Sequence, residues 1–333
     1  MLAFLKEQIS SVVSRVTGRE SDLDTVFALL PEINLRLIPS SRERWSDTER
    51  LDGDHAKLEA QGLEHCGFFN FKGQGDFSEL SIWQYKNAVT IALCETSNES
   101  DEDDASLAQY SMSAVVKLSN GHTLSISNAE SADWLPQPEQ HRTVKSHAGD
   151  VYELLKSLKK NTPVATKIIP SKDPLALFSE HYEGYSAWLW TEEQLASSAF
   201  AEACEALDIS LSDNDLDELI ETGREQLSSA YTRKILTRLE QSSQMSDETW
   251  EEIRNRLVVV HEKMTADDIS NTVYRLVTSP SVDQEEMIDE FSESVNSSTP
   301  LESFRELISS LNSDAKRIAT MSQPVSSEIY LAD

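Results

Sequence analysis

HCGFFNF at residues 65–71, AVTIAL at 88–93 and LSIS at 124–127 belong to the stretch, residues 64–128, that decides the fold. In the second and third of these segments apolar and polar residues alternate, and a period of two is typical of a strand with one buried face. Asn120-Gly121 comes shortly before the last segment, and this pair favours a tight hairpin turn. Short connections require antiparallel neighbours, because parallel pairing needs a long crossover. The stretch therefore predicts an antiparallel meander of about four to five strands.

A strongly acidic segment, ETSNESDEDDAS at residues 95–106, interrupts this pattern. Its carboxylates are dense enough to suggest a cation site, but they lack the Asp-x-Asp-x-Asp-Gly spacing and the distal Glu of a calcium loop. Like charges in a run repel one another and usually lie in solvent. The sequence therefore predicts an exposed loop between two strands and no metal site.

Most of the chain outside this stretch is predicted to be helical, from apolar residues that recur at helical spacing. The expected helices cover residues 2–16, 22–30, 54–62, 150–160, 174–207 with a break near 191, 213–241, 246–264, 265–277, 282–295 and 300–311. Short strands are expected at 33–37 and 164–169. Residues 129–145, which contain Pro136 and Pro138, are expected to cross irregularly.

These elements predict an α+β fold, in which an antiparallel β-meander with flanking helices is followed by a mostly α-helical C-terminal domain. A length of 333 residues allows two domains. We expect an α+β domain at residues 1–170, with strands at about 64–128, and a helical domain at 171–333. The helical domain ends in a tail whose apolar residues, Ile329, Tyr330 and Leu331, predict either a strand added to the sheet or a free peptide for a partner's groove.

The charge is strongly acidic, because 58 Asp and Glu against 29 Lys and Arg give a formal net charge of −29. Such a surface repels nucleic acids and anionic membranes, so we expect no direct nucleic-acid binding. It favours a basic protein partner, although an acidic protein can also imitate the phosphate track of a nucleic acid. The acidity can equally be an adaptation to salt that is shared by a whole proteome.

The cysteines and the apolar segments indicate where the protein works. Cys66, Cys94 and Cys204 are few and widely spaced, which argues against a disulfide framework and for a reducing compartment. No stretch approaches the ~20 apolar residues of a membrane span. Residues 1–18 lack the continuous apolar region and the cleavage site of a signal peptide. We therefore expect a cytoplasmic protein without a membrane span.

The sequence predicts no catalytic residue, no cofactor and no metal site. No two of the seven His residues have the spacing that places them on one helical face, and no Cys-x-x-Cys pair occurs. Phosphate-binding glycine loops and the Gly-x-Ser-x-Gly motif are also absent. His65 and Cys66 are neighbours on an expected strand, so their side chains should point to opposite faces.

Aromatic residues are densest at the start of the helical half, and one local basic patch lies before it. Together they define a candidate interface, which consists of Tyr182, Tyr185, Trp188, Trp190, Trp134, His141, Arg142 and Lys145. Aromatic residues and arginine are enriched at interface hot spots. The aromatic members also fit the main core of the helical domain, or the seam where it packs on the sheet.

The charge and the missing motifs favour a non-enzymatic, acidic, cytoplasmic protein-interaction module. It would be an inhibitor, an immunity-type protein, an adaptor or a chaperone-like binder of a basic partner protein. One alternative is a hydrolase-type enzyme with dispersed His and carboxylate residues in the cleft between the two halves, which a pocket containing His65, His141 or His181 would favour. A second alternative is a nucleic-acid mimic, which requires carboxylates along one ridge. The sequence implies no oligomeric state.

Overall fold

The computed structural model describes residues 22–72, 76–98, 109–243, 245–276, 291, 293, 295–296, 299–311 and 316–332. The chain divides into two compact units. Unit 1 comprises Met1–Leu189 and Glu193–Leu219, and unit 2 comprises Trp190–Glu192 and Ile220–Asp333. The helix expected at 2–16, most of the helix expected at 282–295 and most of the acidic segment lie outside the described residues.

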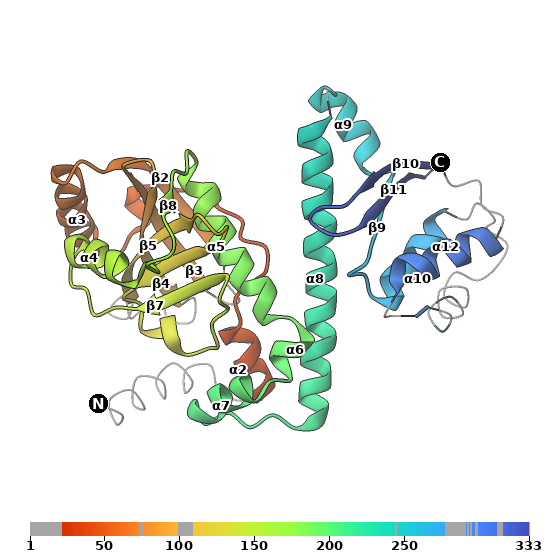
Figure 1. Ribbon diagram of the computed structural model, residues 1–333, viewed down its shortest axis with the longest axis horizontal. Helices are drawn as coiled ribbons and strands as arrows, with labels where there is room; N and C mark the ends of the chain where they lie inside the picture. Colours follow the sequence, from red (N-terminus) through yellow and green to blue (C-terminus); the bar gives the residue numbers. More distant parts are fainter. Residues whose placement is uncertain are drawn as a thin grey trace. The chain divides into compact units, whose positions relative to one another are not determined.

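The sheet of unit 1 is an antiparallel meander from β2 to β6, with further strands beside it (Figure 1). Its strands are β1 (Ile38–Pro39), β2 (Glu64–Lys72), β3 (Asp76–Tyr85), β4 (Val89–Asn98), β5 (Gln109–Leu118), β6 (Thr123–Ser127), β7 (His141–Lys145) and β8 (Ile168–Ile169). They lie in the order β1 to β7, and β8 pairs with β5. Gly121, at a φ of 88°, supplies the left-handed backbone of the turn between β5 and β6. The predicted α+β class and antiparallel meander are thus confirmed.

Several segments of unit 1 differ from the prediction. The helix expected at 54–62 spans Thr48–Ala60, and the strand expected at 164–169 covers Ile168–Ile169 only. Residues 129–145, expected to be irregular, contain the 3-10 helix η3 (Glu130–Asp133) and strand β7, which pairs in parallel with β6. The sequence of β7, HRTVK, lacks the apolar alternation of its neighbours, so its strand form depends on pairing with β6. The strand expected at 33–37 is displaced to β1, which pairs with β2.

Helices cover both faces of this sheet (Figure 1). On one face, α3 (Thr48–Ala60) and α4 (Val151–Asn161) bury a core that includes Trp83 and Ile91. On the other face, α5 (Pro174–Leu189) packs on Leu80 and Ile82. The two cores alternate along the strands, because successive strand residues point to opposite faces.

The limits of the two units do not coincide with the expected domain limits, 1–170 and 171–333. Helix α5 belongs to unit 1 because it packs on β3, β4, β5 and β7. The expected domain limits stay a prediction. Among the described residues before 213, the other helices are α2 (Asp22–Leu29), η1 (Arg42–Arg44), α6 (Glu192–Leu195) and α7 (Ser198–Ala206). Within the described residues, no helix is both long and apolar enough to cross a membrane.

Unit 2 contains a second, three-stranded sheet in the order β10-β11-β9, in which both pairs are antiparallel. Its described elements are α8 (Asp213–Ser242), which begins in unit 1, α9 (Asp247–Arg254), β9 (Leu257–His261), α10 (Ala266–Leu276), α12 (Pro300–Ser310), β10 (Lys316–Met321) and β11 (Ser327–Leu331). The single helix expected at 246–264 is wrong, because it ends at Arg254 and is followed by β9. The run of β-branched residues from Val258 to Val260 favours a strand.

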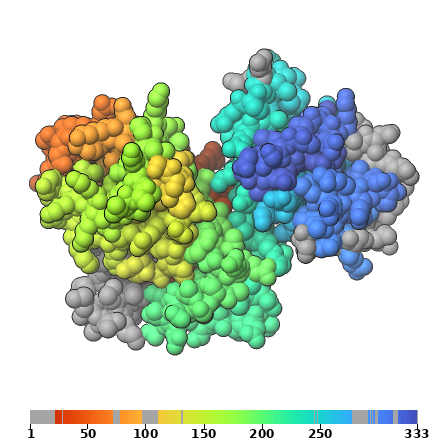
Figure 2. Space-filling model, viewed as in Figure 1, coloured from red at the N-terminus to blue at the C-terminus, as the bar shows by residue number. Residues whose placement is uncertain are grey.

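The tail docks as a strand, which is the first of the two expected alternatives. It does so as β11 in the second sheet, however, and not on the meander. Strands β10 and β11 belong to the dark blue part of unit 2 in Figure 2.

Helices also cover both faces of this second sheet. On one face, Val258, Val260 and Tyr330 share a core with residues of α10 and α12. On the other face, Leu257 and Val259 share a core with residues of α8 and α9. Unit 2 is therefore a helix–sheet–helix sandwich, and the open edge of β9 lies between its two helical layers.

Candidate functional site at the open edge of strand β9

Strand β9 has one paired edge and one open edge. On the paired edge, the Arg256 carbonyl accepts a hydrogen bond from Ala332 N at 2.9 Å, and Glu262 N donates to the Ser326 carbonyl at 3.2 Å. In an antiparallel pair the residues alternate between bonding to the partner and pointing away from it. Leu257 and Val259 therefore direct their backbone N–H and C=O groups to the other edge, on which no described strand pairs.

At His261, the last residue of β9, the backbone groups of the open edge are bonded by the turn that follows the strand. Met264 N donates to the His261 carbonyl at 3.3 Å, and His261 N lies 3.4 Å from Met264 Sδ. Leu257 and Val259 have no such partner among the described residues, although they are only 5% and 6% exposed. Buried backbone polar groups are nearly always paired, with protein or with water. These two residues thus offer a template for another extended chain.

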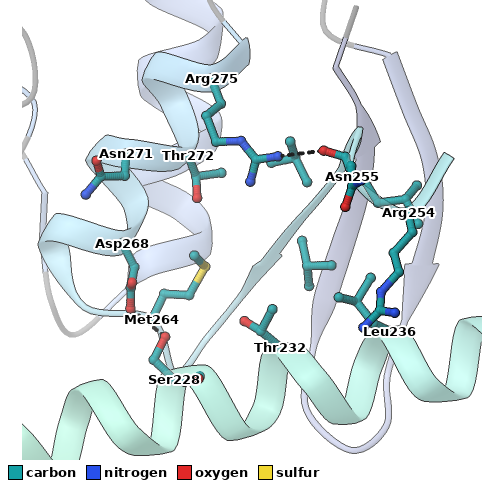
Figure 3. Close-up of a pocket in the computed structure, with 14 residues that line it drawn as sticks. Ser228, Thr232, Leu236, Arg254, Asn255, Met264, Asp268, Asn271, Thr272 and Arg275 are labelled. Atoms are coloured by element: carbon teal, nitrogen blue, oxygen red, sulfur yellow. Dashed lines mark hydrogen bonds between the residues drawn. The ribbon is translucent and has the colours of Figure 1, made fainter. Parts of the chain in front are cut away.

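A groove of about 510 Å³ runs along this edge (Figure 3). Its floor is the edge of β9, one wall comes from α8 and the other from α10 with the turn that precedes it. Its lining residues are Ser228, Ser229, Thr232, Leu236, Arg254, Asn255, Leu257, Val258, Val259, Met264, Asp268, Asn271, Thr272 and Arg275. Hydroxyl groups are the main polar groups of the α8 wall, and the α10 wall carries Asp268, Asn271, Thr272 and Arg275, so the groove can take a polar occupant.

The charged side chains of the groove differ in how many hydrogen bonds and ion pairs they form. The carboxylate of Asp268 accepts hydrogen bonds from Ser228 Oγ at 2.5 Å and from Thr265 N at 3.3 Å. Arg275 donates through Nη2 to the Asn255 carbonyl at 3.2 Å (Figure 3). Arg254 lies 3.6 Å from Glu251 in an exposed pair, and such pairs contribute little. Positive charge therefore remains available near Asn255.

A smaller cavity of about 230 Å³ adjoins the groove and shares Ser229, Thr232, Leu236 and Arg254 with it. Its other lining residues are Arg233, Thr237, Glu240 and Trp250. Trp250 is only 3% exposed, and its indole Nε1–H has no hydrogen-bond partner among the described residues. A buried donor without an acceptor costs free energy, so this indole nitrogen is a locally unfavourable feature beside the cavity.

His261 fastens α8 to β9 behind the groove. Its Nε2 lies 3.0 Å from Thr232 Oγ1 and 3.2 Å from the Ser228 carbonyl, while Nδ1 accepts from Lys263 N at 3.2 Å. These contacts fit a neutral ring protonated at Nε2. Burial lowers the pKa of His261 to about 4. The hydroxyl of Ser228 faces Asp268 and not this histidine, so the three residues do not have the arrangement of a catalytic triad.

The basic part of the candidate interface lies around a buried polar cluster in unit 1. Thr123 Oγ1 lies 3.0 Å from His141 Nδ1 and 2.7 Å from His181 Nδ1, and Thr143 Oγ1 lies 3.0 Å from His181 Nε2. Burial lowers the pKa of His181 to about 3. Gly184 permits the close approach of α5, because a Cβ there would lie 2.4 Å from His141 Nε2. The two histidines are thus held by threonine hydroxyls.

The other members of the candidate interface are mostly held inside their own units. Tyr182 stacks edge-on against Phe71 at 5.8 Å, and burial raises the pKa of both Tyr182 and Tyr185. Trp190 is fully buried, while Trp134 and Trp188 are half-buried. Arg142 is exposed, and Lys145 pairs with Asp133 at 2.8 Å. None of the eight residues lines the groove or its adjoining cavity, and their role as an interface stays a prediction.

His65 contacts a second group of polar atoms beneath α3. Ser81 Oγ lies 3.2 Å from His65 Nε2 and 2.9 Å from His55 Nε2, and it accepts a bond from Trp83 Nε1 at 2.9 Å. Cys66 packs in the core on the opposite face, which confirms the expected divergence of these neighbours. Among the described residues, no group of three or more His, Cys, Asp or Glu could hold a metal ion.

Sequence analysis missed the groove because it assigned β9 to a helix. The signal that could have located it is LVVVH at residues 257–261, a run that is short and rich in β-branched residues. Arg254, Arg275 and the hydroxyl groups of α8 line one groove only when β9 forms and pairs with β11. No protein-family model matches the chain, and comparisons with curated proteins and with solved structures find no significant match.

Proposed function

We propose that the protein is a non-enzymatic protein-interaction module whose partner adds an extended segment to the open edge of β9. The observation that carries this proposal is the pair of unpartnered residues, Leu257 and Val259, on the floor of the groove. In strand addition, main-chain hydrogen bonds supply affinity, and the pockets that receive alternate side chains supply specificity. The groove offers both features.

The dimensions of the groove suit a short segment. A strand rises ~3.3 Å per residue, so the edge from Leu257 to His261 is roughly 13 Å long. Alternate side chains of an added strand would face Ser229 and Thr232 on α8, and Asn271 and Thr272 on α10. A segment of small polar residues would therefore fill the groove without leaving hydroxyl groups unpaired.

The net charge of −29 supports a partner that is basic as a whole. Long-range attraction between opposite charges raises the rate of encounter and weakens as salt is added. The charge would thus bring the partner to the protein, and the groove would hold one segment of it. The inhibitor, immunity-type, adaptor and chaperone-like classes all remain compatible with such a contact.

The test blocks the groove and leaves the rest of α8 unchanged. Ser229 is exposed and lines both cavities, so Ser229→Trp fills the space that the segment needs. Ser242→Trp is the matched control, because Ser242 is exposed near the end of α8 and lines neither cavity. Circular dichroism and thermal unfolding establish that each variant folds.

The wild-type protein and both variants would be used for affinity capture from an extract of the source organism, at low and at high salt. We expect one basic protein to be retained by the wild type and by Ser242→Trp. The same protein should be lost with Ser229→Trp and in high salt. Equal retention by all three proteins would show that the groove is not the contact, and the proposal would then be rejected.

A further inference from the structure

We infer that the segment that enters the groove presents a carboxylate to Arg254 and Arg275. This inference rests on the proposed strand addition and names the chemistry of the occupant. It follows from an excess of hydrogen-bond donors over acceptors at one end of the groove. The groups compared are the side chains around Arg254 and Arg275 in the groove and those that line the adjoining cavity.

The donors come from several elements. Arg275 projects from α10 and Arg254 from the end of α9, and both line the groove beside Asn255 (Figure 3). Arg233 lines the adjoining cavity. Guanidinium groups have five N–H donors and no acceptor, and Arg275 donates from Nη2 to a neutral acceptor, the Asn255 carbonyl oxygen.

The acceptors are fewer and partly occupied. Asp268 accepts two hydrogen bonds from within unit 2, and it forms no ion pair with Arg254 or Arg275 among the described residues. Glu251 pairs only loosely with Arg254, since both side chains are more than half exposed and lie 3.6 Å apart. Glu240 lines the adjoining cavity as a single carboxylate beside two arginines. The donor excess is therefore local, in a chain whose net charge is −29.

Several arginines elsewhere in the described chain are paired with carboxylates, whereas Arg256 donates to a backbone carbonyl, that of Ala332. Arg305 and Arg317 share Glu328, and Arg224 pairs with Glu192 and Glu221. Arg275 instead donates to the Asn255 carbonyl beside the open edge, and Arg233 has no ion pair among the described residues. Charge complementarity thus favours an acidic side chain on the occupant, because arginine binds carboxylates through strong, charge-assisted hydrogen bonds.

The acidic surface of the protein and the acidic group of the occupant would act on different parts of the partner. The whole surface would attract a basic partner, whereas the groove would select an acidic segment of it. Because Arg254 and Arg275 are themselves exposed, salt weakens both effects, and peptides of different charge separate them instead.

The experiment uses three blocked peptides, acetyl-Thr-Glu-Thr-Glu-Thr-amide and its counterparts with Gln or Lys in place of Glu. Each would be titrated into the full-length, isotope-labelled protein, and the backbone amide resonances of Leu257 and Val259 would be followed by NMR. These amides report strand addition for any of the peptides. The ratio of dissociation constants between the Glu and Gln peptides reports the preference for a carboxylate.

We expect the Glu peptide to bind about tenfold more tightly than the Gln peptide, and the Lys peptide to bind most weakly. Arg254→Gln and Arg275→Gln should each reduce that preference to about threefold or less. Arg238→Gln is the matched control, because Arg238 is an exposed arginine of α8 that lines neither cavity, and it should leave the preference unchanged.

Two negative outcomes are distinguishable. Equal binding of the three peptides, with shifts at Leu257 and Val259, would overturn the carboxylate inference and leave strand addition standing. No shift of these two amides at millimolar concentrations of any peptide would overturn both. Retention of the full preference in the Arg254 and Arg275 variants would also overturn the inference, since the carboxylate would then bind elsewhere.

Discussion

Replacing Glu328 with glutamine tests the polar network that joins β11, β10 and α12. Glu328 is buried on β11, and its carboxylate accepts bonds from Arg305 Nη2 at 2.9 Å, Arg317 Nη1 at 2.7 Å and Tyr330 Oη at 2.6 Å. Burial alone would raise the pKa of this carboxyl group, but the three donors together hold its pKa below the usual value. A glutamine has the same shape, yet its amide nitrogen would face a donor from either an arginine or the tyrosine.

The loss in free energy of unfolding can be estimated from these contacts. A hydrogen bond to a charged group contributes about 1.5–3 kcal/mol, and a donor facing a donor loses one such bond outright. Both guanidinium groups are half exposed, so water recovers part of the loss. We expect the free energy of unfolding of unit 2 to fall by about 2 kcal/mol, which corresponds to a decrease in Tm on the order of 5–10 °C.

The assay is urea denaturation with hydrogen exchange at the amides of β10 and β11. The matched control is Glu306→Gln, which makes the same change in charge at an exposed position of α12. The control should stay within about 0.5 kcal/mol of the wild type. If Glu328→Gln is no more destabilising than this control, then the network does not hold β11 in place and the reasoning is wrong.

Three further predictions follow from the histidines, a glycine and the open edge. Burial keeps the folded-state pKa of His181 at about 3 and that of His261 at about 4, below the unfolded value, so the stability they contribute is complete above pH ~6.5 and lost on acidification. At pH 5 each buried histidine should lower the free energy of unfolding by about 2 kcal/mol, which urea titrations at pH 7 and pH 5 would show. A histidine-to-glutamine variant should make the free energy of unfolding depend less on pH. Gly184→Ala should destabilise unit 1 by about 1–3 kcal/mol, because its Cβ would meet a histidine ring at 2.4 Å, and an unchanged Tm would contradict this. Val259→Pro should destabilise unit 2 less than Val260→Pro does, because only the N–H of Val260 bonds to β11, and equal losses in urea unfolding would refute the assigned register.

Local patterns were sufficient for the first sheet. Alternation in AVTIAL and LSIS, together with Asn120-Gly121, predicted the meander because consecutive strands joined by short turns pair with their neighbours. Strand β7 was missed, since its parallel partner precedes it by a whole crossing and its own sequence has no strand pattern. Local propensity carries no information about a partner that lies elsewhere in the chain.

The candidate site depended on contacts that are still more distant. Val258 to Val260 pair with residues 328–330, about seventy positions later, and this pairing outweighs the helical spacing of the apolar residues that precede it. The groove exists only because that pairing uses one edge of β9 and leaves the other between α8 and α10. Similarly, the contact of His141 and His181 through Thr123 required α5 to approach β7 at Gly184, which no local pattern predicts.

The outer strand β10 bears on how the protein avoids sticking to itself. Its side chains are mostly exposed and begin with Lys316 and Arg317, and its register with β11 shifts between Arg317 and Ala319. Charged residues and bulges on an outer strand hinder chance pairing with another chain, which is the usual start of aggregation. The opposite edge is protected by its surroundings instead, since only a narrow, extended chain fits between two helices. The second sheet can therefore keep a vacant strand position without becoming a general site of self-association.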